Sequence, residues 1–309
     1  MWKFVLKRLL ALIPVLLCVT LLVYAILSFA PGDPARIILG MEATEENVAA
    51  LREEMGLNDP MIVQYVRYIF KALQGDMGSS YKTGLPVTLE ITSRVTYTLR
   101  LAGMGILVAI IIALPLGILA AVKQNSIFDN ISMTFTMMGI SMPTFWLGML
   151  CVLLFSVKLG LLPSGGTEGA GSMILPVVAM SLSGLASIAR TTRSSMLEEI
   201  RADYMRTARS KGISEAKAVL QHALQNALIP TLTVTGIQTC TMISNTVLIE
   251  NVFSLPGVGR LLVTSIQERD IPMVLGCIIV FAICFTIINL VVDLLYALVD
   301  PRIKAQYKK

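Results

Sequence analysis

Charged residues are scarce in this sequence. Asp, Glu, Lys and Arg together make up 15% of its 309 residues, whereas soluble domains carry about 25%. Hydrophobic residues make up 55%, and the mean hydropathy is +0.75. So little charge cannot cover the surface of a water-soluble globule of this size, and the sequence therefore predicts an integral membrane protein.

The residues that build metal sites, disulfide frameworks and hydrolase centres are scarce as well. There is one histidine, His222, and the five cysteines form no Cys-x-x-Cys pair. Neither a His-Glu-x-x-His motif nor a phosphate-binding G-x-x-x-x-G-K-[ST] loop occurs. We therefore expect this chain to have no catalytic residue, no metal site and no bound cofactor, so that the energy for its function comes from a partner.

Six long stretches contain no charged residue at all. Each reaches the length of about 18 residues that marks a membrane-spanning helix. They are continuously apolar, whereas the strands of a membrane barrel would alternate apolar and polar residues in segments of about ten. We expect an all-α polytopic membrane protein with six transmembrane helices, within residues 9–32, 101–122, 130–157, 169–189, 218–249 and 271–292.

The basic residues predict the orientation of these helices. With a cytoplasmic N-terminus, fifteen of the 25 Lys and Arg fall in the inner segments, seven of them between the fourth and fifth helices. Cytoplasmic segments carry such an excess of positive charge, so both termini are expected in the cytoplasm. The first apolar stretch is longer than the core of a signal peptide, and residues 1–30 are expected to remain as the first transmembrane helix.

Residues 31–97 form the one sizeable extracytoplasmic segment. Thr44 followed by two glutamates begins one amphipathic run that closes at Gly56, and Asp59-Pro60 begins a second that closes at Gly75. Acidic residues in the first turn and glycine just past the end are typical of helices. We expect two short helices that lie against the outer membrane surface or a partner; a helical cap without a recognition role is the alternative.

The fifth apolar stretch is unusually polar for a membrane helix. Between residues 229 and 249 it contains six threonines, a glutamine, a serine and an asparagine. A helix that faces lipid on all sides gains nothing from such side chains, so we expect a solute pathway lined by Thr235, Gln238, Thr241, Ser244 and Asn245. The alternative is ordinary packing, with the hydroxyls bonded to the helix's own backbone.

The cytoplasmic loop at residues 190–228 is too regular for a flexible linker. Met196, Ile200, Tyr204 and Ala208 recur every four residues, and a second apolar stripe follows Gly212 at Val219, Leu220, Ala223, Leu224 and Ala227. The spacing predicts two helices separated by a glycine turn. Such an ordered loop indicates a docking partner, which by composition is either a protein or the membrane surface.

The loop also carries a family resemblance. Residues 203–212 (Asp-Tyr-Met-Arg-Thr-Ala-Arg-Ser-Lys-Gly), with His222-Ala223-Leu224 and the run from Asn226 to Pro230, resemble the coupling-loop signature of ABC importer permeases of the dipeptide, oligopeptide and nickel branch. In the general Glu-Ala-Ala-x-x-x-Gly form, only Ala208 and Gly212 match. Further landmarks of the branch occur in order along the chain, at residues 31–35, 57–60, 64–65, 75–80, 141–143, 189–196, 256–260 and 300–302.

The resemblance implies a type I importer permease fold, with residues 98–309 as the permease core, in a bacterial inner membrane. It implies three kinds of partner subunit: a second homologous permease, two ATP-binding cassette ATPases that hold ATP and Mg, and an extracytoplasmic binding protein. The ATPase contacts would come from Tyr204, Arg206, Thr207, Ala208, Arg209, Lys211 and Gly212.

The substrate cannot be read from these residues. Di- and oligopeptides are the commonest substrates of the family, and nickel, a metal complex or glutathione are the alternatives within it. From a different class, an ion-coupled secondary carrier is the competing hypothesis, but such a carrier places ionisable groups near the membrane midplane, and the six apolar stretches contain no Asp, Glu, Lys or Arg.

Overall fold

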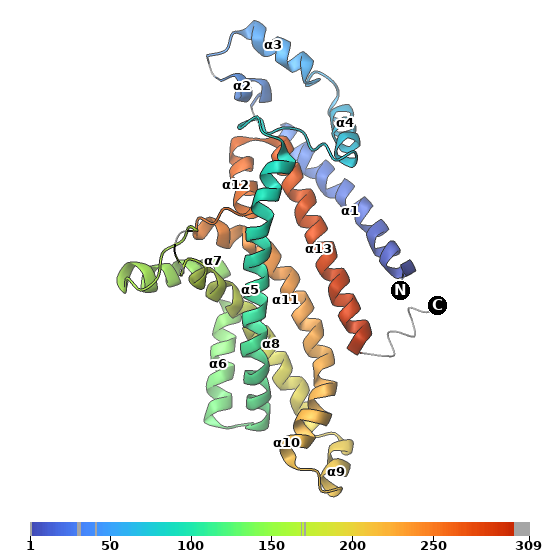
Figure 1. Ribbon diagram of the computed structural model, residues 1–309, viewed down its shortest axis with the longest axis vertical. Helices are drawn as coiled ribbons and strands as arrows, with labels where there is room; N and C mark the ends of the chain where they lie inside the picture. The colour runs from blue at the N-terminus through green and yellow to red at the C-terminus, as the bar shows by residue number, and fades with distance from the viewer. Residues whose placement is uncertain (1, 30–31, 41, 168, 170, 300–309) are drawn as a thin grey trace. The chain divides into compact units, whose positions relative to one another are not determined.

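The computed structural model describes residues 2–29, 32–40, 42–167, 169 and 171–299. Its elements are helices throughout the described ranges, apart from an isolated bridge between Ser79 and Pro86. They are drawn in Figure 1. The described residues form two compact units, one containing residues 98–255 and 287–299, the other residues 2–97 and 256–286. The predicted landmark at residues 300–302 lies outside the described residues.

The unit with the N-terminal segment contains α1 (Trp2–Phe29), α2 (Pro34–Leu39), α3 (Glu45–Glu54), α4 (Met61–Leu73), the start of α5 (Val87–Val122), α12 (Val258–Glu268) and the start of α13 (Ile271–Val299). The two helices predicted at residues 44–56 and 60–75 are confirmed as α3 and α4. The Thr44 hydroxyl caps α3, and α2, which the sequence did not predict, is capped by Asp33.

Landmark residues of the family resemblance fasten α4 to α1. The Tyr65 hydroxyl donates a hydrogen bond to the Leu17 carbonyl at 2.8 Å and lies 2.9 Å from the Thr20 hydroxyl. Gln64 accepts a hydrogen bond from the Tyr24 hydroxyl at 2.9 Å and donates to the carbonyls of the preceding turn. These pairs satisfy polar groups beside an apolar helix, which keeps them from being buried without partners.

The other unit contains the rest of α5 and α13, together with α6 (Ile127–Ser141), α7 (Thr144–Cys151), the π-helical segment η1 (Val152–Lys158), α8 (Ile174–Ile200), α9 (Asp203–Ser210), α10 (Glu215–Ala218), the π-helical segment η2 (Val219–Ala223) and α11 (Leu224–Val252). Helices α8 and α11 have the most extensive contact. Helix α5 approaches α8 closely at Gly117, where a Cβ atom would lie 2.7 Å from the Ala189 carbonyl oxygen.

Among the described residues, five helices are long and apolar enough to span a membrane: Leu10–Phe29, Val87–Val122, Ile174–Ile200, Glu215–Val252 and Ile271–Val292. The predicted third span is not a single helix, because α6 and the α7–η1 segment meet at an angle of 106°. Met142 is extended there, with ψ at 129°, and the residue before a proline is disfavoured in the helical region. Counted as one bent span, this pair gives the predicted total of six.

The charge-free stretches underestimate the lengths of two helices. Helix α5 begins at Val87 rather than near residue 101, and it includes an ion pair between Glu90 and Arg94 at 3.1 Å. Helix α11 continues past residue 249 and includes Glu250, which is fully buried and accepts a hydrogen bond from the Thr98 hydroxyl at 2.7 Å. Both helices therefore continue beyond their apolar parts, and the glutamates within them are paired or hydrogen-bonded, as buried charged groups must be.

Candidate functional site

The loop between α8 and α11 folds into an ordered hairpin, residues 201–218, which we call the cytoplasmic hairpin. Helix α8 ends at Ile200, and Arg201 and Ala202 are not helical. Helices α9 and α10 then follow on either side of Gly212. The break changes the helical phase. As a result, the prediction that Tyr204 belongs to the apolar stripe is wrong. Met205 is fully buried instead, and Tyr204 is 37% exposed.

A small apolar core lies beneath the hairpin. It contains buried residues of α5, α8, α9, α10, η2 and α11: Ala121, Met196, Met205, Ala218, Val219, Ala223 and Ala227. Leu220, predicted in the second stripe, is instead 54% exposed, since it lies in η2, where the wider π-helical turn shifts the register. The hairpin is therefore packed against the ends of the long helices on one side and leaves its polar side free.

Gly212 closes α9 with the geometry that favours glycine. Its φ is +77°, and its N–H donates to the Arg209 carbonyl while the Ile213 N–H donates to the Ala208 carbonyl. These two bonds form a Schellman motif, in which the residue at this position is left-handed. Ile213 packs onto the apolar core, as the residue after such a glycine commonly does.

An ion pair spans the glycine turn. The Arg209 guanidinium donates two hydrogen bonds to the Glu215 carboxylate, at 2.8 and 2.7 Å. A two-point contact of this kind fixes orientation as well as distance. The sequence predicts that Arg209 contacts acidic groups of an ATPase. In this structure its guanidinium pairs with Glu215 within the hairpin.

A second polar cluster joins α8, α9 and α11. The Tyr204 hydroxyl donates to Glu199 at 2.5 Å and accepts from the Asn226 amide at 3.1 Å. Partial burial, and then the hydrogen bond to the Glu199 carboxylate, raise the pKa of Tyr204 above its usual value, so the phenol stays protonated as a donor at neutral pH. Tyr204 thereby joins the start of the hairpin to α8 and α11.

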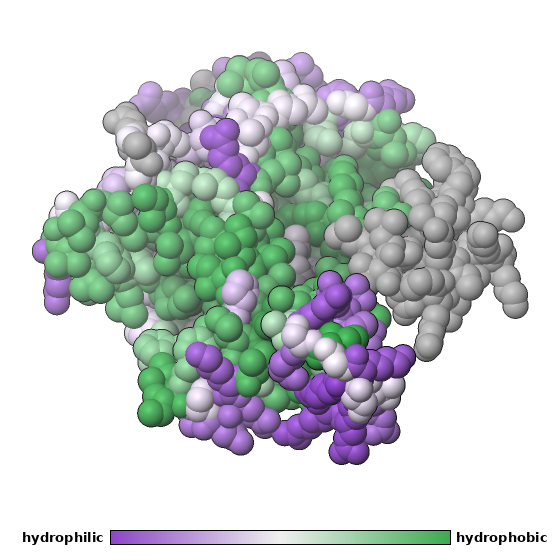
Figure 2. Space-filling view, turned by 60° about the horizontal axis from the view of Figure 1, so that its bottom comes forward, coloured by the Kyte–Doolittle hydropathy of each residue, from purple (hydrophilic) through white to green (hydrophobic). Residues whose placement is uncertain are grey.

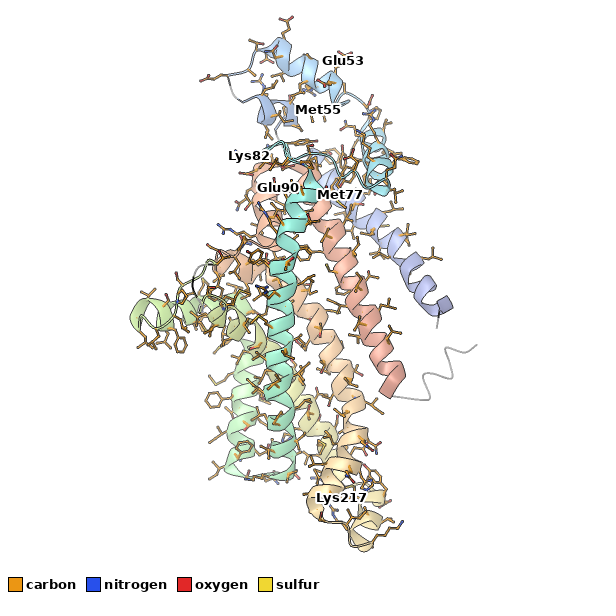
Figure 3. All side chains as sticks on the ribbon, viewed as in Figure 1. Glu53, Met55, Met77, Lys82, Glu90 and Lys217 are labelled. Carbon is orange, nitrogen blue, oxygen red and sulfur yellow. The ribbon has the colours of Figure 1, made fainter. Side chains whose placement is uncertain are left out.

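The remaining predicted residues of the hairpin differ in exposure. Arg206, Thr207 and Lys211 are exposed, and Arg206 lies 3.9 Å from Asp203 with both side chains at least 80% exposed. Such a pair contributes little, which leaves the Arg206 charge available to a partner. Ala208 is buried. Figure 2 shows hydrophilic residues gathered at the end that carries α9 and α10, and Figure 3 places Lys217 on α10 within it.

The five predicted pathway residues do not share one face of α11. Thr241 and Ser244 are exposed. Gln238 faces α8, with its Cβ 3.8 Å from the position of a Cβ on Gly184, and the Asn245 amide lies 3.5 Å from the Thr144 hydroxyl of α7. Thr235 lies about two and a half turns from Ser244, on the opposite side, where it lines an apolar cavity of about 240 Å³ with residues of α5 and α13.

The threonine hydroxyls of α11 follow the packing alternative. All six donate to a backbone carbonyl three or four residues earlier, as threonines do in apolar surroundings. In contrast, the side chains of Gln238 and Ser244 make no hydrogen bond to other residues within the described ranges. The polar groups available to a solute or a partner are therefore fewer than the composition predicts.

No group of three or more His, Cys, Asp and Glu side chains that could hold a metal ion occurs among the described residues. Of the five cysteines, Cys240 and Cys277 are buried, and no disulfide bond joins any two of the five within the described residues.

Two family models match the chain in succession. The model of the N-terminal part of binding-protein-dependent transport system membrane components matches residues 1–102, and the model described as "Binding-protein-dependent transport system inner membrane component" matches residues 113–305. The chain belongs to this family. It is therefore a multi-pass permease component of an ABC importer in the bacterial inner membrane, and its work depends on ATPase and binding-protein subunits.

Curated relatives match this permease over nearly all of its residues. It is 44% identical to the glutathione transport system permease protein GsiC of Salmonella paratyphi A, over 98% of this chain and 99% of the relative. The same protein from Escherichia coli (strain K12) is also 44% identical with the same coverage. These relatives confirm the predicted branch of importer permeases.

Solved structures confirm the type I importer permease fold. A chain of the inward-facing MetNI methionine ABC transporter aligns with a TM-score of 0.57 at 19% identity, covering 69% of this permease and 97% of that chain. An amino acid ABC transporter solved with histidines gives a TM-score of 0.53 at 16% identity, covering 68% and 94%.

The sequence did not predict several polar contacts of the permease that hold its candidate site. Glu215 and Asn226 support the hairpin from outside the signature residues, and Asp129 of α6 pairs with Arg193 of α8. The spacing of Arg209 and Glu215, three residues on either side of a glycine, was the one available signal. The other partners are too far apart in sequence for spacing to reveal them.

Proposed function

We propose that this permease forms half of the translocation pathway of an ATP-driven importer for short peptides, and that glutathione is among its substrates. It pairs with a second homologous permease and receives the movement of two ATP-binding cassette ATPases through the cytoplasmic hairpin. ATP and Mg are held by the ATPases, and this chain binds no cofactor of its own. The observation that carries the coupling to the ATPases is the ordered hairpin with an exposed polar side.

Three properties of the hairpin support docking to a protein. Its backbone is held by the apolar core, the Gly212 turn and the Arg209–Glu215 pair, so little conformational entropy remains to be lost on binding. Arg206 and Lys211 offer exposed positive charge. Leu220 of η2, just beyond the hairpin, is 54% exposed and offers an apolar contact beside these charges.

The pathway is proposed to run along the exposed face of α11 at Thr241 and Ser244. Ser244 supports this, since its exposed hydroxyl retains hydrogen-bonding capacity for a peptide backbone, and Gln238, half-buried beside α8, could add its amide at the edge of this face. Asn245 borders the same region, whereas the apolar surroundings of Thr235 favour a packing role. This permease lines one side of the pathway, and the second permease lines the other.

The substrate class rests on the named relatives. Glutathione is a tripeptide, so relatives that transport it fall within the peptide class expected from the sequence. Nickel or another metal complex is the alternative within the family, and an ion-coupled carrier is the alternative from another class.

Transport by the purified complex in proteoliposomes tests this proposal. We expect uptake of radiolabelled glutathione that requires the binding protein and internal ATP, and that an excess of unlabelled short peptide reduces. Uptake of ⁶³Ni with no uptake of glutathione or dipeptide would reject the peptide class. Uptake driven by a proton or sodium gradient without ATP would reject the importer mechanism itself.

A further inference from the structure

Helix α6 is linked to α8 by a buried ion pair. The Asp129 side chain, in the first turn of α6, is 1% exposed and receives hydrogen bonds from Arg193 Nε at 2.6 Å and Nη2 at 2.7 Å. Arg193 is three-quarters buried and lies near the cytoplasmic end of α8. A paired carboxylate and guanidinium in such surroundings are held firmly, because separating them would leave a buried charge without its partner.

The same carboxylate fixes the turn that joins α5 to α6. The Asn125 N–H donates to Asp129 at 2.9 Å, and the Asp129 N–H donates to the Ser126 hydroxyl at 3.2 Å. Asn125 is left-handed, with φ at +61°, a conformation that asparagine tolerates better than most residues. Ser126 therefore caps α6, and the Asp129 carboxylate ties the α5–α6 turn, residues 123–126, to α8.

Two further contacts join this turn to the region of the cytoplasmic hairpin. Arg201, which directly follows α8, donates a hydrogen bond to the Gln124 side chain at 2.9 Å. Ala121, in the last turn of α5, belongs to the apolar core that contains Met196 and Met205. In Figure 1 the α5–α6 turn lies at the same end as α9 and α10. The turn is thus attached to α8 and α9 through an ion pair, a hydrogen bond and apolar contacts.

The hairpin is covalently continuous only with α8 and α11. Movement of the hairpin reaches α6 only if non-covalent contacts carry it there. Helices α6 and α8 pack against each other, and among the described residues Asp129–Arg193 is the ion pair that fixes the orientation of this packing at the end beside the hairpin. We propose that Asp129 and Arg193 are positioning residues that make the hairpin, α8 and the α5–α6 turn move as one body, so that ATPase closure displaces α6 together with α8. This inference rests on the proposed function, since it presumes that the hairpin docks an ATPase.

The experiment uses the complete complex of permeases, ATPases and binding protein in nanodiscs and proteoliposomes. Spin labels at Met137→Cys, on an exposed position of α6, and Lys217→Cys, on an exposed position of α10 in the hairpin, report the distance between them before and after trapping with ATP and vanadate. In the otherwise unchanged permease we expect this distance to stay constant. In Asp129→Asn we expect it to change or broaden, and ATP hydrolysed per glutathione imported to rise about tenfold, while the ATPases still copurify.

Asp59→Asn is the matched control. It makes the same substitution in another aspartate–arginine pair, with Arg67, that is about 40% exposed and lies in the extracytoplasmic segment, and it should alter neither readout. If Asp129→Asn fails to assemble, Arg193→Lys decides, because it keeps the charge but loses the two-point contact; a raised ATP cost per glutathione supports the inference.

Three outcomes would overturn the inference. One is an assembled Asp129→Asn complex with an unchanged ATP cost and a constant distance. Another is a label distance that changes on trapping in the unsubstituted permease. The third is an unchanged ATP cost in Arg193→Lys when Asp129→Asn does not assemble. Failure of the proposed function is distinguishable, because then the unsubstituted permease itself would bind no ATPase.

Discussion

Replacing Gly212 with valine should abolish both ATPase copurification and substrate uptake while the chain still inserts into the membrane. The φ of +77° at this residue costs an L-residue about 1–2 kcal/mol, and a β-branched side chain more. The added Cβ itself would meet no atom within 4 Å, so the effect comes from the backbone. Valine would move the chain out of the Schellman turn and separate Arg209 from Glu215. Copurification of the ATPases and uptake in proteoliposomes are the measurements.

Two control variants separate this effect from general damage. Gly212→Asn should retain most of the activity, because asparagine tolerates the left-handed region. Gly75→Val places valine at another glycine with positive φ, +89°, and no atom within 4 Å of the added Cβ, but in the extracytoplasmic segment. It should leave ATPase binding unchanged. Normal ATPase binding by Gly212→Val would contradict the role assigned to the turn.

Cysteines at Thr241 and Ser244 should react with a small charged thiol reagent in the assembled complex, whereas a cysteine at Thr235 should not. The first two positions lie on the exposed face of α11, and Thr235 lies opposite, in an apolar cavity. A charged reagent is excluded from apolar surroundings, so we expect nearly complete labelling in one case and almost none in the other. Mass spectrometry of a permease whose native cysteines are replaced measures the modified fraction.

The result at Thr235 also serves as the internal control for folding, because an unfolded permease would label at all three positions. Equal labelling at Thr235 and Ser244 would reject the assignment of faces. An inert Thr241 and Ser244, with the complex assembled, would mean that this face packs against another helix instead of lining the pathway.

Local features of the sequence predicted much of the hairpin. Capping signals and apolar periodicity act within a few residues. They predicted the turn at Gly212, and they also predicted helices α3 and α4. The assignment of Tyr204 to the buried stripe failed because periodicity was extended across the break at Arg201 and Ala202. Once the phase is reset there, Met205 takes the buried position.

Contacts between distant residues could not be predicted in this way. Asp129 and Arg193 are 64 residues apart in sequence, and each is an ordinary polar residue in its own segment. The charge-free stretch at 130–157 similarly predicted a span but not its bend of 106°, because apolar composition does not report direction. The Pro143 in that stretch was the local signal for the break.

Site-specific photo-crosslinking from Lys211 tests whether the cytoplasmic hairpin docks an ATPase subunit. A photoreactive amino acid is placed at Lys211 in the hairpin and, as a control, at Lys158, an exposed residue at the end of η1 that the charge distribution assigns to the outer side. In native membranes we expect a crosslink from Lys211 to the ATPase subunit, and none from Lys158. Crosslinks from Lys211 to lipid alone would contradict the account, as would equal crosslinking to the ATPase from both positions.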